Sequence, residues 1–335
     1  EADAALMNTV CFDVFTLGNH EFDEGDAGLR RFLDYLRSGP CQTTVLAANV
    51  EPAIGSPLAP VAIDDYRKPY LLQEVDGIVV GIIGIDVRGK TMNSSRPLAT
   101  TLFRDEVDTA QKTIDELRAR GIRHIILVTH QGYEADKAMA ARLSDVDVII
   151  GGDSHTLLGN FPALGISGSS GPYPTVVENG DGERVCVGQA WEYAKAFALM
   201  QVRFDDRGAV ASCSGEVILP IGDDFRQKNG AEAFVAVDTA TRARILEQLA
   251  QHSAARIVSP DPIAQAAFAH YAGRLGDMKR QRIGTAGESL CLVRVPGEST
   301  NRSSGVAGCE SANTLARGSD IAQAVAQAYR QASRL

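Results

Sequence analysis

The chain has 335 residues, of which 44% are hydrophobic and 22% charged, which is the composition of an ordinary globular protein. This length allows two domains and a sizeable buried core. The 33 basic and 42 acidic residues give a net charge of −9, which argues against a nucleic-acid backbone or an anionic membrane as a partner. The sequence has no apolar run long enough to predict a membrane-spanning helix.

The predicted elements alternate between helices and strands over the first 150 residues. After a helix that ends within 4–8, apolar residues at helical spacing occur over 29–36, 107–120 and 138–143. Short apolar runs, which predict buried strands, occur at Val10–Leu17, Val45–Ala48, Ile125–Val128 and Val146–Ile150. Asp76-Gly77, between the strand-like runs 70–74 and 78–85, predicts a β-hairpin. This alternation predicts an α/β fold with largely parallel central strands.

The pattern changes in the second half of the chain. The stretch 161–183, rich in Gly, Ser and Pro, predicts a loop near the functional site. Strand-like runs at Val185–Gln189, Phe197–Phe204 and Ala209–Ile218 predict an antiparallel meander. A helix over 262–279, a short strand at Leu290–Val295 and a final helix from about Asp320 follow. The last fifty or so residues carry too little apolar patterning to close a core, so we interpret them as the opening of a second domain.

The chain has six cysteines and no Cys-x-x-Cys pair, so a zinc–thiolate cluster is not expected, and the even number suits an oxidising compartment. Cys186 and Cys213 lie on segments that could pair as neighbouring strands, and Cys291 and Cys309 flank a polar loop. Both pairs are candidate disulfides. Cys11 lies in an apolar run and is interpreted as an inert core thiol.

Three predicted strands end in polar clusters that contain metal-ligand residue types. These clusters are Gly18-Asn19-His20-Glu21-Phe22-Asp23, Thr129-His130-Gln131-Gly132 and Gly151-Gly152-Asp153-Ser154-His155-Thr156. Ligands of open α/β sheets bind beyond the carboxyl ends of the strands, so we expect the three clusters to meet at one rim. A set of imidazole nitrogens with carboxylate or amide oxygens suits zinc, manganese, cobalt or iron better than calcium.

Each cluster also has an ordinary structural interpretation. A lone histidine such as His130 is more often structural than a ligand, Asp23 could be a helix N-cap, and Asp153 and His155 could belong to a simple turn. The coincidence of three such clusters favours a metal site. The other histidines, for which we expect no catalytic role, are His124, His252 and His270.

The three motifs resemble those of the 5′-nucleotidase family of calcineurin-like metallophosphoesterases. Gly18–Asp23 looks like the central signature of that family, and the other two clusters are similar to its next metal motifs, in the same order and spacing. The resemblance covers essentially the whole chain, including Ala47-Ala48-Asn49-Val50 and Gln189-Ala190-Trp191-Glu192. The segment Leu290–Ile321 looks most like the bacterial periplasmic NAD nucleotidases.

The resemblance implies an architecture and a location. It implies a four-layer αββα catalytic domain over residues 1–225, a connecting segment with a linker helix over 226–280, and a partial C-terminal nucleotidase domain over 281–335. It also implies a periplasmic or secreted protein that binds a small-molecule nucleotide and no nucleic acid. The oligomeric state is left open.

The resemblance also implies a reaction and roles for particular residues. The reaction is hydrolysis of 5′-nucleotides to nucleoside and phosphate, and of the NAD pyrophosphate bond, by hydroxide that two divalent metals (Zn, Mn or Co) generate and direct at the phosphoryl group. The catalytic dyad would be His20 and Asp23, with Asn19 and His20 contacting the substrate phosphate. The metal ligands would be Asn19, His130 and Asp153 for one metal and His155 for the other.

Two departures from the family pattern qualify these expectations. Position 153 is Asp where the family usually has His, and a carboxylate can bind a metal but adds negative charge near the phosphate. The family takes its remaining ligands from Asp-x-His and Gly-Asp motifs that would lie upstream, and its nucleotide pocket from a Gly-Gly-Gly-[Ile/Val]-Arg motif that would lie downstream. We therefore expect the chain to be incomplete at both ends, with an active full-length protein and an inactive isolated chain.

Two alternatives remain open from the sequence. The same scaffold would serve a 2′,3′-cyclic-nucleotide phosphodiesterase or a UDP-sugar hydrolase. A non-catalytic metallophosphoesterase-like binding protein is an alternative of a different class, which Asp153 favours and the intact Asn19, His20 and Asp23 disfavour.

Overall fold

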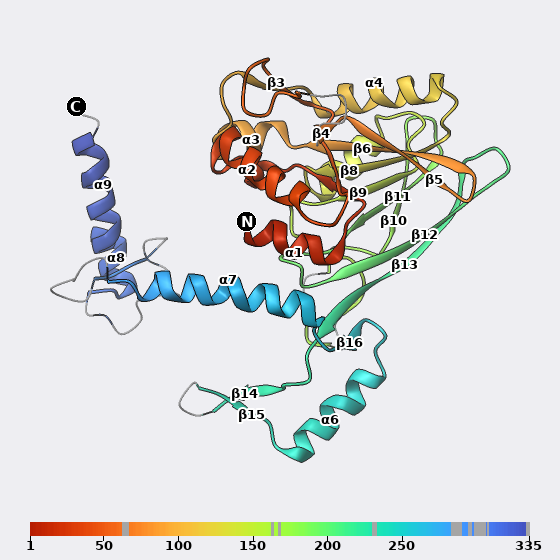
Figure 1. Ribbon diagram of the computed structural model, residues 1–335. Coiled ribbons are helices and arrows are strands. Elements are labelled where there is room, and N and C mark those ends of the chain that lie inside the picture. The colour runs from red at the N-terminus through yellow and green to blue at the C-terminus, as the bar shows by residue number, and fades with distance from the viewer. Residues whose placement is uncertain are drawn as a thin grey trace. The chain divides into compact units, whose positions relative to one another are not determined.

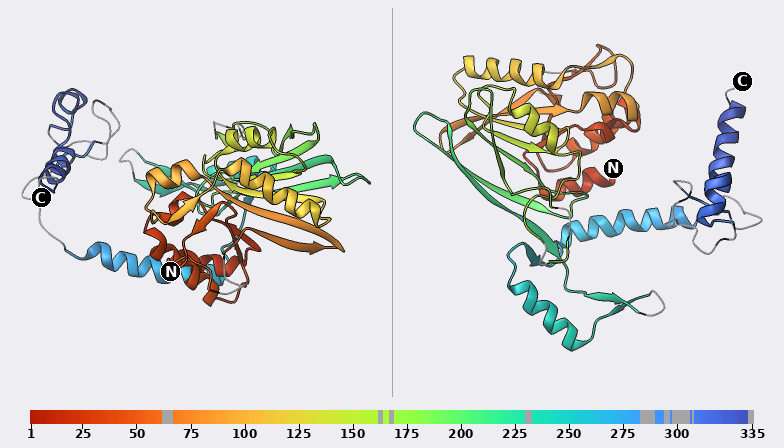
Figure 2. Two further views of the ribbon diagram at one scale, coloured as in Figure 1. Left: turned by 90° about the horizontal axis from the view of Figure 1, so that it is seen from above. Right: turned by 180° about the vertical axis from the view of Figure 1, so that it is seen from behind.

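A computed structural model describes residues 1–61, 67–161, 164–166, 169–229, 233–282, 290–293, 297, 306 and 308–332. The chain divides into two compact units, Glu1–Tyr271 and Ala272–Leu335. The three clusters of candidate ligands all lie in the first unit, which Figures 1 and 2 show from three directions.

A six-stranded mixed sheet forms the centre of the first unit. Its order is β10-β11-β9-β8-β6-β5, in which the four central strands are parallel and the two edge strands antiparallel to their neighbours. The hairpin between β5 and β6 turns at Asp76 and Gly77, both with positive φ, as a tight two-residue turn requires. The bounds are β5 (Tyr70–Val75), β6 (Ile78–Asp86), β8 (His124–His130), β9 (Val148–Gly151), β10 (Thr175–Glu178) and β11 (Arg184–Gln189).

Helices cover the face of this sheet toward which alternate apolar strand residues point. Ile125 and Leu127 of β8 are fully buried in a cluster with Ile114 and Leu117 of α4 (Glu106–Ala119) and Met139 of α5 (Tyr133–Ala140). The side chain of Asp105 caps α4 by accepting hydrogen bonds from two backbone N–H groups of its first turn. Figure 1 shows α4 lying along the outside of the sheet.

A second β layer lies against the other face of the sheet, in two parts. One part is the parallel sheet β1 (Val14–Thr16), β2 (Thr44–Leu46) and β4 (Arg67–Lys68), and the other is the sheet β12 (Phe197–Phe204), β13 (Val210–Ile221) and β16 (Ala255–Ile257). The two layers approach closely where the Ala48 N–H donates to the Gly84 carbonyl at 2.8 Å, and a Cβ at Gly84 would lie only 2.4 Å from Leu46.

Two further helices complete the layers. Buried Leu29 and Leu33 of α2 (Gly25–Ser38) and Ala4 of α1 (Ala2–Val10) pack with Leu17 and Val45 beside β1 and β2. The order helices, sheet, sheet, helices confirms the predicted α/β fold of the αββα type (Figure 2). Short elements near the rim are η1 (Asn19–Phe22), α3 (Arg88–Ser94), β3 (Val50–Pro52) and β7 (Thr101–Phe103).

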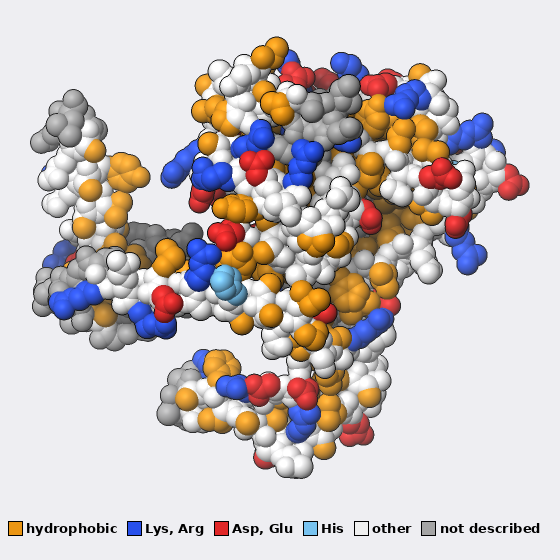
Figure 3. Space-filling view, in the orientation of Figure 1, with side chains coloured by type: hydrophobic (Ala, Val, Ile, Leu, Met, Phe, Trp, Pro, Cys, Tyr) orange, Lys and Arg blue, Asp and Glu red, His pale blue; other side chains and the backbone are white. Residues whose placement is uncertain are grey.

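The β12–β13 part of the second layer is only partly covered within the described ranges. Its inner face packs on the six-stranded sheet through Val148, Cys186 and Val210. Phe197 and Leu199 on β12 are 45% and 51% exposed. Figure 3 shows hydrophobic side chains on the surface over the region of β13 and β16.

The remaining elements follow β13. They are β14 (Arg226–Lys228), β15 (Phe234–Ala236), α6 (Thr239–Ala250), α7 (Pro262–Arg280), α8 (Ser311–Arg317) and α9 (Asp320–Ala332). Among the helices of the described ranges, none is long and apolar enough to cross a bilayer. Three disulfides join Cys11 to Cys41, Cys186 to Cys213 and Cys291 to Cys309, so the last two pairings are confirmed.

The structure corrects several sequence predictions. Val10 belongs to α1, and β1 begins only at Val14, because the polar Asp13 interrupts the apolar run. Cys11 was predicted to be a core thiol, but it is the exposed C-cap of α1 and forms a disulfide with Cys41.

The other corrections concern the later strands. The predicted meander loses its first strand, since β11 pairs with β9 and β10 in the central sheet. The predicted loop 161–183 contains the edge strand β10. Leu290–Val293 form no strand, and the rest of that prediction, Arg294 and Val295, lies outside the described residues.

Candidate active site

The candidate site lies where strands of two different layers end. β1 of the second layer is followed by η1, which carries Asn19 and His20, whereas β8 and β9 of the central sheet end at His130 and Gly151. The Thr16 hydroxyl donates to the Val128 carbonyl at 3.2 Å, which joins the end of β1 to that of β8. The three polar clusters therefore meet at one rim, as the sequence predicts.

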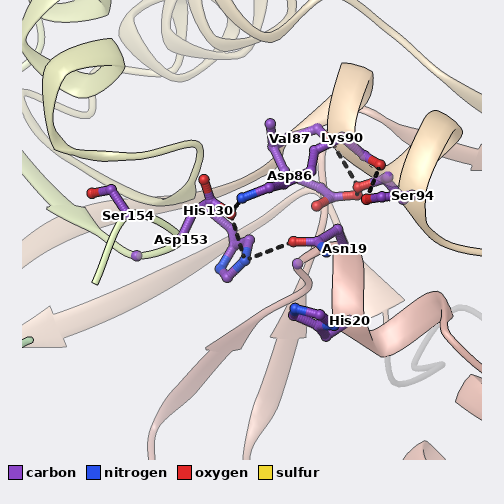
Figure 4. A network of polar contacts seen from close by, with 12 residues as sticks. Asn19, His20, Asp86, Val87, Lys90, Ser94, His130, Asp153 and Ser154 are labelled. Carbon is purple, nitrogen blue, oxygen red and sulfur yellow. Dashed lines mark hydrogen bonds and ion pairs between the residues drawn. The ribbon is translucent and has the colours of Figure 1, made fainter. Parts of the chain in front are cut away.

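Two of the predicted ligands, Asn19 and Asp153, approach a ring nitrogen of a third, His130 (Figure 4). Nε2 of His130 lies 3.2 Å from Oδ1 of Asn19 and 3.5 Å from Oδ1 of Asp153. Burial lowers the pKa of His130, and the neighbouring Asp153 opposes that shift. Burial therefore favours the neutral imidazole, the form that can bind a metal.

Two glycines allow the His130 ring to lie where it does. A Cβ at Gly18 would lie 2.5 Å from the ring carbons, and a Cβ at Gly152 would lie 3.1 Å from its Nδ1. A Cβ at Gly18 would therefore clash with the ring, and a Cβ at Gly152 would fit only if the ring moved slightly. This contact explains the Gly in each of the two motifs.

The distances from Nε2 of His130 to the oxygens of Asn19 and Asp153 are compatible with a shared cation. Two ligands of a metal at about 2.1 Å stand roughly 3.0–3.4 Å apart in octahedral or tetrahedral geometry. The separations of Asn19 and Asp153 from Nε2 of His130 lie close to that range. Counting only His, Cys, Asp and Glu, the part of the chain that the structure describes has no group of three that could hold a metal. A cation site formed by His130 and Asp153 would therefore need the amide oxygen of Asn19 as a third ligand.

Lys90 of α3 is a residue that the sequence analysis missed. Its Nζ lies 2.5 Å from Oδ1 of Asp153, so the Lys90 ammonium forms an ion pair with this carboxylate (Figure 4). Lys90 follows the end of β6, a fourth strand end at the same rim, whose Asp86 lies in register with His130. The order of strands in the sheet is the signal that would have pointed to it.

His20 and Asp23 form a hydrogen-bonded pair at the edge of the cluster. Nδ1 of His20 lies 2.8 Å from Oδ2 of Asp23, and the Ser95 hydroxyl donates to Oδ1 of the same carboxylate at 2.9 Å. The contact with His20 is the main cause that lowers the pKa of Asp23, and Ser95 adds to it. His20 is 76% exposed, so its other ring nitrogen is accessible to a ligand.

His155 stands apart from the other predicted ligands. Its Nδ1 lies 3.3 Å from a carboxylate oxygen of Glu192, and its ring is 5.0 Å from that of Tyr193. Both partners follow β11; Glu192 lies in a segment that carries the family resemblance, but neither residue was predicted to belong to the site. The described residues supply His155 with one further ionic ligand candidate, Glu192, and so do not complete a second metal site.

Backbone strain is concentrated around these residues. Of the eight non-glycine residues with positive φ in the described ranges, five are Asp153, His155, Trp191, Tyr193 and Ala194. Each such residue costs on the order of 1–3 kcal/mol and persists only where the surroundings impose it. This concentration supports a functional role for the two segments, 153–155 and 191–194.

The buried side chain of Gln189 holds the strained turn by three hydrogen bonds. The Gln189 side chain donates to the Gly152 carbonyl at 2.7 Å and accepts a hydrogen bond from Ser154 at 3.1 Å and another from the Thr156 N–H. Gln189 is 3% exposed and lies in register with Gly151. The sequence analysis did not predict this role of Gln189, because the register depends on the parallel pairing of β9 with β11.

Two buried carboxyl groups lie beneath the site. Burial raises the pKa of Asp86 to about 8 and that of Asp136 to about 7. Asp86 accepts a hydrogen bond from Thr91 of α3, and Asp136 accepts hydrogen bonds from Thr129 and Gln131 on either side of His130. These hydrogen bonds join the ends of β6 and β8 to the helices α3 and α5 that follow them.

Comparisons with known proteins agree with this architecture. No family model matches the chain. The chain is 40% identical over 233 residues to a protein of Treponema pallidum named probable 5′-nucleotidase, covering 69% of the chain and 37% of that protein. It is 32% identical over 318 residues to the NAD 5′-nucleotidase of Haemophilus influenzae, covering 94% of the chain and 50% of that protein. The chain thus spans half or less of the length of these relatives.

Solved structures show the same fold. The NAD nucleotidase of Haemophilus influenzae matches with a TM-score of 0.76 at 32% identity, over 85% of this chain and 55% of that one. A calcineurin-like phosphoesterase of Bacillus subtilis, at a TM-score of 0.54 and 21% identity, covers 84% of this chain and 75% of that one and shows the fold alone. The resemblance to the 5′-nucleotidases is confirmed, and the chain has their calcineurin-like fold.

Proposed function

We propose that this chain is part of a periplasmic or secreted phosphohydrolase that removes phosphate from 5′-nucleotides and cleaves the pyrophosphate bond of NAD. The observation that carries the proposal is the His20–Asp23 pair beside the cluster of Asn19, His130 and Asp153. The names of the relatives, 5′-nucleotidase and NAD 5′-nucleotidase, support this choice of substrates.

The His20–Asp23 pair is suited to proton transfer and phosphate binding. Because Asp23 accepts from Nδ1, the other ring nitrogen of His20 is available to contact a phosphoryl oxygen or to protonate the leaving oxygen. Asn19, which is 2% exposed, is held by the short helix that also carries His20, so that both groups keep one orientation.

A divalent cation bound by Asn19, His130 and Asp153 would supply an activated water and would neutralise charge on the phosphoryl group. His155 would hold a second cation. The neutral form that burial favours for His130 and the two glycines that enclose its ring support the first assignment. Zinc, manganese and cobalt suit this donor set.

The proposed location outside the cytoplasm is supported by the cysteines. All six are joined in three disulfides, which form and persist in oxidising compartments.

The proposal is tested by phosphate release from AMP and NAD, measured with Mn²⁺ on the longest natural chain that carries this sequence. His20→Ala is expected to lower kcat by about a hundredfold or more, because the general acid is removed. The matched control is His270→Ala, an exposed histidine on α7, which is expected to keep the wild-type rate.

Two results would contradict the proposal. Phosphate release no faster than that of His20→Ala would favour a non-catalytic binding protein, which the ion pair between Lys90 and Asp153 also favours. Faster cleavage of a 2′,3′-cyclic nucleotide or of a UDP-sugar than of AMP would favour the other hydrolases of this scaffold.

A further inference from the structure

The segment that follows α3 is fastened along η1 and the start of α2. The Arg96 N–H donates to the Phe22 carbonyl at 3.0 Å, and the Leu98 N–H donates to Oδ1 of Asp26 at 2.7 Å. Asp26 is only 1% exposed, so this acceptor is held in a packed environment. The two hydrogen bonds therefore fix the place of residues 95–98 beside η1.

Ser95 begins this segment and is held from both sides. It is the C-cap of α3, and its N–H donates to the Thr91 carbonyl at 3.3 Å, while the next residue is the Arg96 that binds Phe22. The Ser95 hydroxyl donates to Oδ1 of Asp23 at 2.9 Å, although the two residues are 72 positions apart in the chain. The donor thus reaches Asp23 from a backbone that is itself tied down.

The Asp23 carboxylate makes a different contact at each of its oxygens. Oδ2 lies 2.8 Å from Nδ1 of His20, and Oδ1 accepts from Ser95. The Asp23 N–H also donates to the His20 carbonyl at 3.2 Å, so the backbone of η1 sets the separation of the two residues. The backbone does not set the rotation of the carboxylate, because the last torsion of an aspartate is broad and this side chain is 49% exposed. One hydrogen bond at each oxygen defines that rotation.

We propose that Ser95 is a positioning residue that sets the orientation of the Asp23 carboxylate and, through it, the orientation of the His20 ring. This inference rests on the proposed function, since it concerns how the His20–Asp23 pair is held for the reaction. A carboxylate only accepts hydrogen bonds, so its orientation depends on donors that are themselves fixed, and the hydroxyl at the end of α3 is such a donor. His20 can contact a phosphoryl or leaving oxygen productively only when its ring keeps one orientation.

The first test is the orientation of Asp23, read from crystal structures of the longest natural chain that carries this sequence. In the wild type we expect one Asp23 rotamer, with Ser95 and His20 each in hydrogen-bonding distance of a different oxygen. In Ser95→Ala we expect a second Asp23 rotamer and a longer or broken contact with Nδ1 of His20. The matched control is Ser94→Ala, which removes an exposed hydroxyl that donates to the Lys90 carbonyl and should leave Asp23 in its wild-type orientation.

The second test is AMP hydrolysis with Mn²⁺ by the same variants. Ser95→Ala is expected to lower kcat about three- to tenfold and to leave KM within about twofold, because the lost hydrogen bond orients a group that acts in the transition state. Ser95→Thr keeps the hydroxyl and is expected to retain most of the wild-type kcat. Position 95 has φ −115° and ψ −170°, an extended conformation that β-branched residues favour. Ser94→Ala is expected to keep the wild-type kcat.

A double-mutant cycle separates an effect through Asp23 from a general structural effect. Ser95→Ala is expected to lower kcat as above in the wild-type background, but to change it by less than about twofold in an Asp23→Ala background. Melting temperatures of all variants check that folding is retained. Equal factors in the two backgrounds would mean that Ser95 does not act through Asp23 and would overturn the inference.

A single, unchanged orientation of Asp23 in Ser95→Ala would also overturn it. The failure of this inference is distinguishable from that of the proposed function. If AMP is not hydrolysed but the orientation of Asp23 depends on Ser95, the proposed function fails and the positioning role stands. If AMP is hydrolysed and neither the orientation of Asp23 nor kcat responds to Ser95, the positioning role fails alone.

Discussion

His130 shows how a single residue depends on its immediate neighbours. Its ring lies between the backbones of Gly18 and Gly152, and its Nε2 faces the oxygens of Asn19 and Asp153. Burial lowers the pKa of the ring, while the nearby carboxylate of Asp153 opposes this shift. Substitutions at the glycines should therefore act on the histidine.

Gly18→Ala tests this dependence. The added Cβ would lie 2.5 Å from the His130 ring, which also lies close to the backbone of Gly152. Such overpacking is expected to lower the free energy of unfolding by about 1–3 kcal/mol and to weaken Mn²⁺ binding. Urea unfolding and calorimetry measure the two effects. Gly89→Ala, in α3 with open space around it, is the control and should not destabilise the protein. Equal behaviour of the two variants would refute the steric argument.

Lys90→Met tests the ion pair with Asp153. The ammonium competes with a divalent cation for the carboxylate and repels it, so its removal is expected to raise Mn²⁺ affinity. Because the Lys90 end of this pair is about half-exposed to solvent, we expect a contribution of about 1 kcal/mol or less, which corresponds to at most roughly fivefold in affinity. Calorimetry measures the change, with Lys137→Met, which removes a lysine paired with Glu134, as the control. A weaker affinity in Lys90→Met would instead mean that Lys90 holds Asp153 in place.

At the scale of elements, the site is a meeting of strand ends from two β layers. η1 follows a strand of the second layer, whereas His130 and Asp153 follow strands of the central sheet. The position of one layer on the other therefore sets the distances in the site. Cys186 of β11 and Cys213 of β13 join the central sheet covalently to the β12–β13 part of the second layer.

The double variant Cys186→Ala/Cys213→Ala tests the contribution of this covalent link. The two cysteines are 27 residues apart, and closing a loop of that length in the unfolded chain stabilises the folded state by about 3 kcal/mol. Urea unfolding of the variant is expected to show that loss, whereas Cys291→Ala/Cys309→Ala, in the second unit, should leave the unfolding of the first unit unchanged. An unaltered midpoint in the first variant would mean that the disulfide contributes little.

At the scale of the whole molecule, the buried carboxyl groups set a pH dependence of stability. Burial raises the pKa of Asp86 to about 8 and those of Asp136 and Asp147 to about 7. In the unfolded chain an aspartate titrates near about 4. Between these pKa values the folded state therefore binds more protons than the unfolded chain. The contribution of these three groups to the free energy of unfolding is greatest below about pH 4 and falls as the pH rises toward 7–8.

Asp147→Asn is expected to reduce this fall. Asp147 accepts the Ile125 N–H at 2.7 Å, and an asparagine oxygen can still accept it without a charge to bury. We compare the free energy of unfolding of Asp147→Asn with that of the wild type. The difference in favour of the variant is expected to be about 1–3 kcal/mol larger at pH 8 than at pH 5. Urea unfolding at the two pH values measures it, with the exposed Asp206→Asn as the control. A gain that does not change with pH would contradict the buried-carboxyl explanation.

The sequence by itself determined the residue types of the site and the order of most elements. Asn19, His130 and Asp153 each follow an apolar run, and the alternation of such runs with helical spacing predicted the parallel α/β sheet. These features are local, because hydrophobic periodicity and strand-end position depend on neighbours along the chain.

Only the tertiary structure decided which side chains face one another. The ion pair of Lys90 with Asp153, the clamp of Gln189 on the Gly152–Thr156 turn and the contact of Glu192 with His155 all join segments more than thirty residues apart. Such contacts depend on strand order, on register and on the position of one β layer on the other. Periodicity along the chain records none of these, because it reports which face of an element is buried and not what that face meets.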